Sequence, residues 1–146
     1  MKISTRARYG ARLMFQLALD YGKGLSLLRN IAKKEELSEK YLSLIVIPLK
    51  AQNLIVSGRG AKGGYMLAKA PALITMKEIV ETLDGEVSVS ECIGNPKKCG
   101  RFPGCITRDV WKILDEKIQA TLEAITLQDL VDKYNMEKNP SANYEI

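Results

Sequence analysis

Residues 26–52 read SLLRNIAKKEELSEKYLSLIVIPLKAQ, and this stretch decides the fold of the chain. Apolar residues at helical spacing predict a short helix over residues 28–32, followed by a tight connection at Leu37. Ser38 can cap a second helix, because its side-chain oxygen can accept from free backbone N–H groups. The apolar face of this second helix comprises Leu42, Ile45 and Leu49. A short helix, a turn and a helix with polar and aromatic residues in its first turns are typical of a helix-turn-helix.

Pro48 lies inside the second helix of this motif. An interior proline removes a backbone hydrogen bond and costs a helix about 3 kcal/mol, so we expect a kink or an early end. Residues 44–47 could alternatively form a buried strand, since short apolar runs are ambiguous by periodicity. We favour the helix because this run continues an apolar face that begins at Tyr41.

The next segment, LIVSGRGAKGGYMLAKAP at residues 54–71, predicts a β-hairpin with strands at 54–56 and 65–67. Its glycines supply the turn and permit close backbone approach, and its tip carries Arg59 and Lys62. The spacing does not match a phosphate-binding loop, which requires Lys and Ser or Thr after its last glycine. A hairpin directly after a helix-turn-helix is a wing, whose arginine can enter a narrow minor groove.

Helices are also predicted on both sides of the motif and its wing. Ser4 or Thr5 caps a first helix that ends before Gly22 and Gly24. The run Thr75-Met-Lys-Glu78 is a capping box, and Gly85 ends the helix that it opens. The apolar stripe of the first helix comprises Tyr9, Leu13, Met14, Leu17, Ala18 and Tyr21.

The C-terminal part predicts a long amphipathic helix with Trp111 beside its apolar stripe. The stripe comprises Val110, Leu114, Ile118, Leu122 and Ile125. It could pack against its own domain, but we favour a dimerisation helix because the N-terminal half already closes a small core. A dimer also suits DNA recognition through repeated half-sites. Thr126 then starts a last short helix that reaches about Tyr134.

The expected fold is therefore mainly α with a small β-hairpin, a winged helix-turn-helix domain with a long dimerisation helix. The chain of 146 residues, 46% of them hydrophobic, is long enough for one ordinary core. We divide it into a DNA-binding domain at 1–84, a cysteine loop at 85–105, the dimerisation and C-terminal helices at 106–134, and a flexible tail at 135–146.

All three cysteines lie within fourteen residues of one Gly- and Pro-rich loop, ECIGNPKKCGRFPGC at 91–105, as Cys92, Cys99 and Cys105. Such clustering indicates a metal or an iron–sulfur cluster, and nearby lysines would offset the negative charge of the thiolates. A zinc site built from three thiolates and a carboxylate, or reactive thiols without a metal, remain alternatives. The chain has no histidine, so imidazole is not a ligand.

The net charge of +5 is distributed unevenly along the chain. Residues 1–70 carry 13 lysines and arginines against 4 acidic residues, whereas residues 71–146 carry 9 against 13. The basic half is expected to face a polyanion. An electron-transfer or cluster-scaffold protein would not need that basic half, and acid–base machinery typical of an enzyme is not visible. No segment has the form of a signal peptide or the length of a membrane span, so we expect a cytoplasmic protein.

In this order, the motifs resemble the winged-helix family of bacterial transcription regulators that sense iron–sulfur clusters, and most closely its iron–sulfur cluster regulator branch. The resemblance extends from residue 1 to about residue 134. It is carried by MKISTRARYGARLM, LSEKYLSLI, RGAKGGYMLAK, the spacing C-x6-C-x5-C and ITLQDLV. It implies a homodimeric repressor that binds double-stranded operator DNA and controls cluster-biogenesis genes. It also implies an iron–sulfur cluster, 2Fe-2S or alternatively 4Fe-4S, on the three cysteines.

The same resemblance suggests which residues contact DNA. Arg59 would enter the minor groove with Lys62 beside it at the wing tip, and Arg6 and Arg8 would contact phosphate. The residues expected to approach base edges or phosphates in the major groove are Ser38, Lys40, Tyr41 and Ser43. Tyr41 could instead pack inward, since it directly precedes an apolar position of the helix.

The sequence departs from the family at three positions. Arg108 stands where the family has a histidine as its fourth cluster ligand, three positions after the last cysteine. Arg8 stands where a relative with a 4Fe-4S cluster supplies an aspartate from the partner subunit, and Ser43 replaces a glutamate that restricts operator choice. The candidates for a fourth ligand are Glu91, Thr107 and Asp109, besides a small molecule or solvent.

Overall fold

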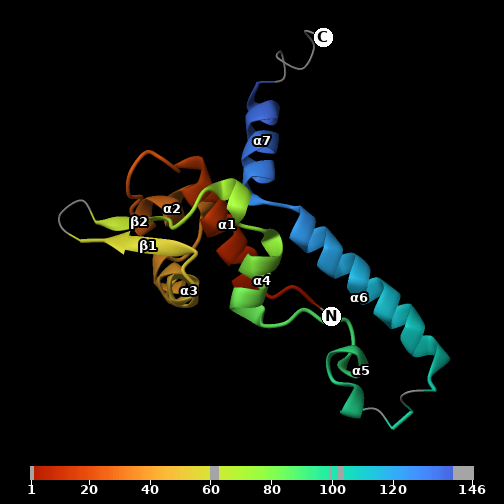
Figure 1. Cartoon of the computed structure of the whole chain (residues 1–146). Helices are drawn as coiled ribbons and strands as arrows, with labels where there is room; N and C mark the ends of the chain where they lie inside the picture. The colour runs from red at the N-terminus through yellow and green to blue at the C-terminus, as the bar shows by residue number, and fades with distance from the viewer. Residues whose placement is uncertain (1, 60–62, 99, 102–103, 140–146) are drawn as a thin grey trace.

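The structure is a computed structural model that describes residues 2–59, 63–98, 100–101 and 104–139. Figure 1 shows a cluster of helices beside a hairpin, with a long helix that runs away from this cluster towards the cysteine loop. The elements in chain order are α1 (Thr5–Leu19), α2 (Leu28–Glu35), α3 (Glu39–Ala51), β1 (Ile55–Gly58), β2 (Gly64–Leu67), η1 (Pro71–Leu73), α4 (Met76–Asp84), α5 (Glu91–Gly94), η2 (Pro96–Lys98), α6 (Ile106–Ala124) and α7 (Leu127–Lys138). The expectation of a mainly helical fold with one hairpin is confirmed.

Helix α1 lies in the centre of the core. Its cap is Ser4, whose side chain accepts from the backbone N–H of Ala7. Its side chains at Leu13, Met14 and Leu17 are almost completely buried. The expectation that Tyr21 continues this stripe is wrong, because the helix ends at Leu19 and Tyr21 is exposed. The chain turns away there through Gly22 and Gly24, both with positive φ.

Helix α3 is continuous through Pro48 to Ala51, so the expected early end is wrong and residues 44–47 are not a strand. Pro48 lies in the last turn, where its missing N–H removes only one intrahelical hydrogen bond. Leu49, directly after it, is fully buried and holds this last turn against the core. Burial of a leucine is worth about 1.5–3 kcal/mol, which offsets much of the cost of the proline.

The wing is an antiparallel pair in which Ile55 lies opposite Leu67 and Gly58 opposite Gly64. The chain just before α2 pairs with the wing at one position: the N–H of Ser26 donates to the carbonyl of Tyr65 at 2.8 Å, and the N–H of Tyr65 donates to the carbonyl of Ser26 at 2.9 Å. The wing is thereby tied to the helix-turn-helix by backbone hydrogen bonds.

Helix α7 packs on the N-terminal domain. Leu127 is fully buried, and its N–H donates to the carbonyl of Ile74 at 2.9 Å. The ring of Tyr134 meets Phe15 of α1 edge-on, with centroids 5.6 Å apart. The helix reaches Lys138, beyond the end expected near Tyr134, so residues 135–138 of the expected tail are helical. Residues 140–146 lie outside the described residues.

Helix α6 is the projecting element, and none of its 19 residues is fully buried. Polar contacts attach it to the segment after α4: Asp115 accepts from the N–H of Val89 at 3.1 Å, and Gln119 donates to the carbonyl of Val87. Figure 1 shows α6 beginning near α5, running beside α4 and ending where α7 begins. Within the part of the chain that the structure describes, no helix is long and apolar enough to cross a membrane.

The contact between the wing and residues 25–27 generates the first prediction. A methyl group at Gly64 would collide with the carbonyl of Ser26, and the φ of Gly64, +147°, disfavours other residues. Gly64→Ala should therefore lower the free energy of unfolding by about 1–3 kcal/mol, measured by chemical denaturation. The control is Gly100→Ala, where a methyl group meets open space. Equal stability of the native protein and Gly64→Ala would contradict the proposed wing packing.

Candidate DNA-binding surface and cysteine loop

The two helices of the motif are joined by a tight turn. Glu36 adopts a left-handed conformation that ends α2, and the N–H of Leu37 donates to the carbonyl of Ala32 at 2.9 Å. Ser38 then caps α3 as the sequence predicts, accepting from the N–H of Tyr41 at 3.2 Å. The expected helix-turn-helix is thus present, with one side of α3 buried and the other exposed.

Several of the residues expected to contact DNA lie on the exposed side of α3. Lys40 and Ser43 are exposed, and the hydroxyl of Ser43 donates to the carbonyl of Lys40 at 2.5 Å. The ring of Tyr41 is half-buried and meets Tyr9 of α1 edge-on, with centroids 5.8 Å apart. Tyr41 therefore packs inward, which is the alternative to base contact that the sequence left open.

An ion pair that the sequence did not suggest fixes α2 to α1. The guanidinium of Arg12 donates to the Glu35 carboxylate at 2.8 Å and also to its backbone carbonyl. Gln16 donates to the same carboxylate at 2.7 Å. Arg12 also lies over the ring of Tyr9, 5.6 Å from its centroid, next to Tyr41. Arg12 thus links α1 to α2 directly, and contacts the Tyr9 ring that packs on Tyr41 of α3.

The other basic residues expected to contact DNA are exposed where the structure describes them. Arg6 and Arg8 are exposed on the first turn of α1, where Arg8 donates to the Thr5 hydroxyl at 3.0 Å. Arg59 is exposed and directly follows β1 in the wing. Lys62 lies outside the described residues.

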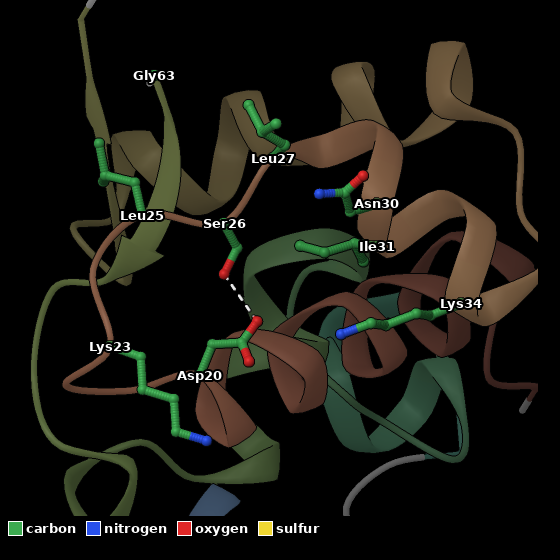
Figure 2. A pocket seen from close by; sticks show the side chains of 9 residues that line it. All are labelled: Asp20, Lys23, Leu25, Ser26, Leu27, Asn30, Ile31, Lys34 and Gly63. Atoms are coloured by element: carbon green, nitrogen blue, oxygen red, sulfur yellow. Dashed lines mark hydrogen bonds between the residues drawn. The ribbon is translucent and has the colours of Figure 1, made fainter. Parts of the chain in front are cut away.

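A pocket of about 410 Å³ lies between α2, the end of α1 and the wing. Figure 2 shows the Ser26 side chain directed at Asp20, to which its hydroxyl donates at 2.8 Å. Lys23 and Lys34 also line the pocket. The Ser26–Asp20 hydrogen bond holds the segment that pairs with β2 of the wing. The pocket therefore lies where the wing contacts the helix-turn-helix.

Two of the three cysteines lie within the described residues, and both are free, half-exposed thiols. The sulfur of Cys92, in α5, is 2.9 Å from the Ser90 hydroxyl, and its backbone carbonyl accepts from Arg108 at 3.4 Å. Cys105 immediately precedes α6, and its sulfur is 3.3 Å from the Thr107 hydroxyl. Cys99 lies outside the described residues, and among the others no three potential ligands come together.

The Thr107 hydroxyl, followed by the backbone N–H of Arg108 and the charge of Arg101, lowers the pKa of the Cys105 thiol. A thiol that ionises readily is a good ligand for soft metals and for iron–sulfur clusters. Free, part-exposed thiols with hydroxyl partners therefore fit a thiolate-bound metal group. Of the candidates for a fourth ligand, Glu91 and Asp109 are exposed on the first turns of α5 and α6, while Thr107 already contacts Cys105.

A helix-turn-helix followed by a hairpin, on a core from which a partly apolar helix projects, defines a winged-helix DNA-binding protein. Residues 3–133 match the model of the Rrf2 family, described as iron-dependent transcriptional regulators, and the chain belongs to this family. The expectations of a DNA-binding transcription regulator and of a protein that is not an enzyme are thereby confirmed.

Individual relatives agree with this assignment. The chain is 37% identical over 130 residues to the regulator CymR of Bacillus subtilis, covering 89% of each chain. The structure of CymR, the global cysteine regulator of B. subtilis, superposes with a TM-score of 0.82 at 35% identity, covering 91% of this chain and 98% of the other. IscR of T. potens gives a TM-score of 0.76 at 34% identity, covering 92% and 88%.

The Cys105 environment generates the second prediction. In the metal-free protein, Thr107→Val removes the hydroxyl donor, so the pKa of Cys105 should rise and its alkylation should require higher pH. Iodoacetamide labelling followed by peptide mapping measures the midpoint for this cysteine alone. Thr121→Val is the matched control, because Thr121 lies on the same helix and donates to the Lys117 carbonyl. An unchanged midpoint in Thr107→Val would show that the hydroxyl does not stabilise the thiolate.

Proposed function

We propose that the protein is a homodimeric repressor whose operator binding depends on an iron–sulfur cluster held by Cys92, Cys99 and Cys105. In this proposal it acts in the cytoplasm and controls genes of iron–sulfur cluster biogenesis. The observation that carries the proposal is the confinement of all cysteines to the one loop that joins the DNA-binding core to α6. The description of the family as iron-dependent favours iron over zinc.

The DNA contacts follow from the exposed side of α3 and the wing. We place α3 in the major groove with Lys40 and Ser43 facing the DNA, while Ser38 and Tyr41 set the start of the helix. Arg59, together with Lys62, would enter the minor groove. Arg6 and Arg8 would contact phosphates, because both are exposed at the start of α1.

The dimer is proposed from the apolar side chains that α6 leaves in solvent. Ile106 is 83% exposed and Val110 56%. Ile113, Leu114 and Trp111 on the same helix are also exposed. A second copy of the chain would bury them and would hold two copies of α3 about one DNA turn apart, roughly 34 Å.

Hydrogen bonds connect the cysteine loop to α6. Through them, a change in the loop can affect DNA binding. Arg108 of α6 donates to the carbonyl of Cys92, and Asp115 and Gln119 bind the loop backbone at residues 89 and 87, ahead of the first cysteine. A change of order in the loop would therefore change how α6 is attached to the core. Because α6 is the proposed dimer helix, the relative setting of the two α3 helices would shift between populations.

A bound cluster, most simply 2Fe-2S and alternatively 4Fe-4S, supplies redox-active iron that responds to iron supply and oxidation. Lys97, Lys98 and Arg101 are exposed around the loop and would offset the negative charge of the bound thiolates. The cysteines would be the metal ligands, with Glu91, Thr107 or Asp109 as candidates for the fourth. A zinc-binding or a redox- or nitric-oxide-responsive repressor is the alternative within the same fold.

A second candidate function is regulation of cysteine metabolism, which the 37% identity to CymR favours. The two candidates differ in what the cysteine loop must hold. A cluster-sensing repressor requires iron and sulfide on the loop. The electron-transfer and scaffold alternatives receive no support from the family.

Metal content tests the proposal and is the third prediction. Protein purified without oxygen should be coloured and contain iron and sulfide, and each of Cys92→Ala, Cys99→Ala and Cys105→Ala should lose both. The folded core should be unaffected, because the described cysteines are only partly buried and lie outside it, and chemical denaturation checks this. Among Glu91→Ala, Thr107→Val and Asp109→Ala, the variant with an altered spectrum identifies the fourth ligand.

Two outcomes would contradict the proposal. Colourless protein with one zinc per chain would favour the zinc-binding repressor. Colourless protein without any metal, even after supply of iron and sulfide, would favour the regulator of cysteine metabolism.

A further inference from the structure

The exposed side of α3 is apolar in its middle. Leu44 is 58% exposed and Ile47 62%, and they lie one turn apart on the same side of the helix. The opposite side is formed by Leu42, Ile45 and Leu49, which are almost completely buried. Leu44 and Ile47 therefore do not belong to the core of the described chain.

The polar groups near Leu44 and Ile47 either form a hydrogen bond within the helix or lie before and after the pair in the sequence. The Ser43 hydroxyl donates its proton to the Lys40 carbonyl at 2.5 Å. Lys40 and Lys50 lie before and after the pair, and both are exposed. Between these two lysines the sequence contains no Arg, Asn, Gln, Asp or Glu, which are among the side chains that recognise base edges by hydrogen bonds.

We propose that Leu44 and Ile47 are specificity-determining residues that recognise thymine through its C5-methyl group. The inference rests on the proposed placement of α3 in the major groove. Among the base edges exposed in that groove, only thymine carries an apolar group, so it is the group that an aliphatic side chain can recognise. The flanking lysines complement the phosphates on either side of the groove, which favours DNA over an apolar protein partner as the occupant.

Recognition of thymine methyl groups predicts the base composition of the operator half-sites. Each half-site should contain A·T pairs where the middle of α3 lies, and the position of thymine on one strand should matter. Deoxyuridine is the direct probe, because it differs from thymidine only by the C5-methyl group. Loss of that methyl group leaves base pairing and every hydrogen-bonding group of the major groove in place.

DNA that the protein itself selects provides the test. Duplexes are selected from a random library by the full chain purified without oxygen, and each thymine of one half-site is then replaced by deoxyuridine. Affinity is measured at fixed salt, since phosphate contacts are salt-sensitive. Replacement at one or two positions should weaken binding about threefold to fivefold per methyl group, and replacement elsewhere should have little effect.

Protein variants assign the effect to the two side chains. Leu44→Ala and Ile47→Ala should each bind the thymine duplex more weakly, and each should no longer distinguish thymine from uracil at its own position. Both residues are exposed, so the variants should remain folded, which circular dichroism checks. Arg59→Ala is the matched control: it should weaken binding to both duplexes by the same factor and keep the ratio between them.

Two results would overturn the proposal, and they are distinguishable. If the native protein binds every uracil duplex within twofold of the thymine duplex, or if Leu44→Ala and Ile47→Ala keep the native ratio, the methyl group is not recognised although DNA binding persists. If the full chain selects no duplex at all, the placement of α3 in the major groove fails as well, and the apolar pair is assigned to a protein contact.

Discussion

The burial of α1 against α3, α4 and α7 is the constraint on which the rest of the structure depends. Leu13, Met14 and Leu17 lose nearly all contact with water, and each such side chain contributes about 1.5–3 kcal/mol. Gly10 has no side chain where Leu83 of α4 approaches, so the two helices can pack closely. With α1 fixed, the ion pair between Arg12 and Glu35 fixes α2, and the tight turn after α2 sets the direction of α3.

The cysteine loop and α6 are attached to this core in a different way. The described contacts between α6 and residues 87–89 are hydrogen bonds, formed by Asp115 and Gln119, and no residue of α6 is fully buried. An element held by partly buried polar contacts, with no fully buried side chain of its own, moves at a lower free-energy cost than one held by a dense apolar core. The chain thus combines a DNA-binding unit with an apolar core and a helix, α6, whose own side chains are at most half-buried and which carries the proposed dimer surface next to the proposed metal site.

Local signals explain what the sequence predicted correctly. Ser38 and Thr75 cap their helices as expected, because capping depends on residues only three positions apart. The interactions that escaped prediction join distant segments: Arg12 with Glu35, and Tyr134 of α7 with Phe15 of α1. The exposure of Leu44 and Ile47 also depends on tertiary packing, since periodicity alone does not distinguish a buried run from a half-exposed one. The helix continues through Pro48 because burial of Leu49 offsets the lost hydrogen bond, and this burial depends on tertiary packing that the local sequence does not show.

The central claim is that the cysteine loop controls DNA binding, and one comparison tests it most directly. The affinity of the anaerobically purified chain for a selected duplex is measured before and after removal of iron by a chelator, at fixed salt. We expect the affinity to change about tenfold or more, and we expect Cys92→Ala to have the iron-free affinity from the start and not to respond to the chelator. Equal affinities for the native protein before and after iron removal, and for Cys92→Ala, would contradict it.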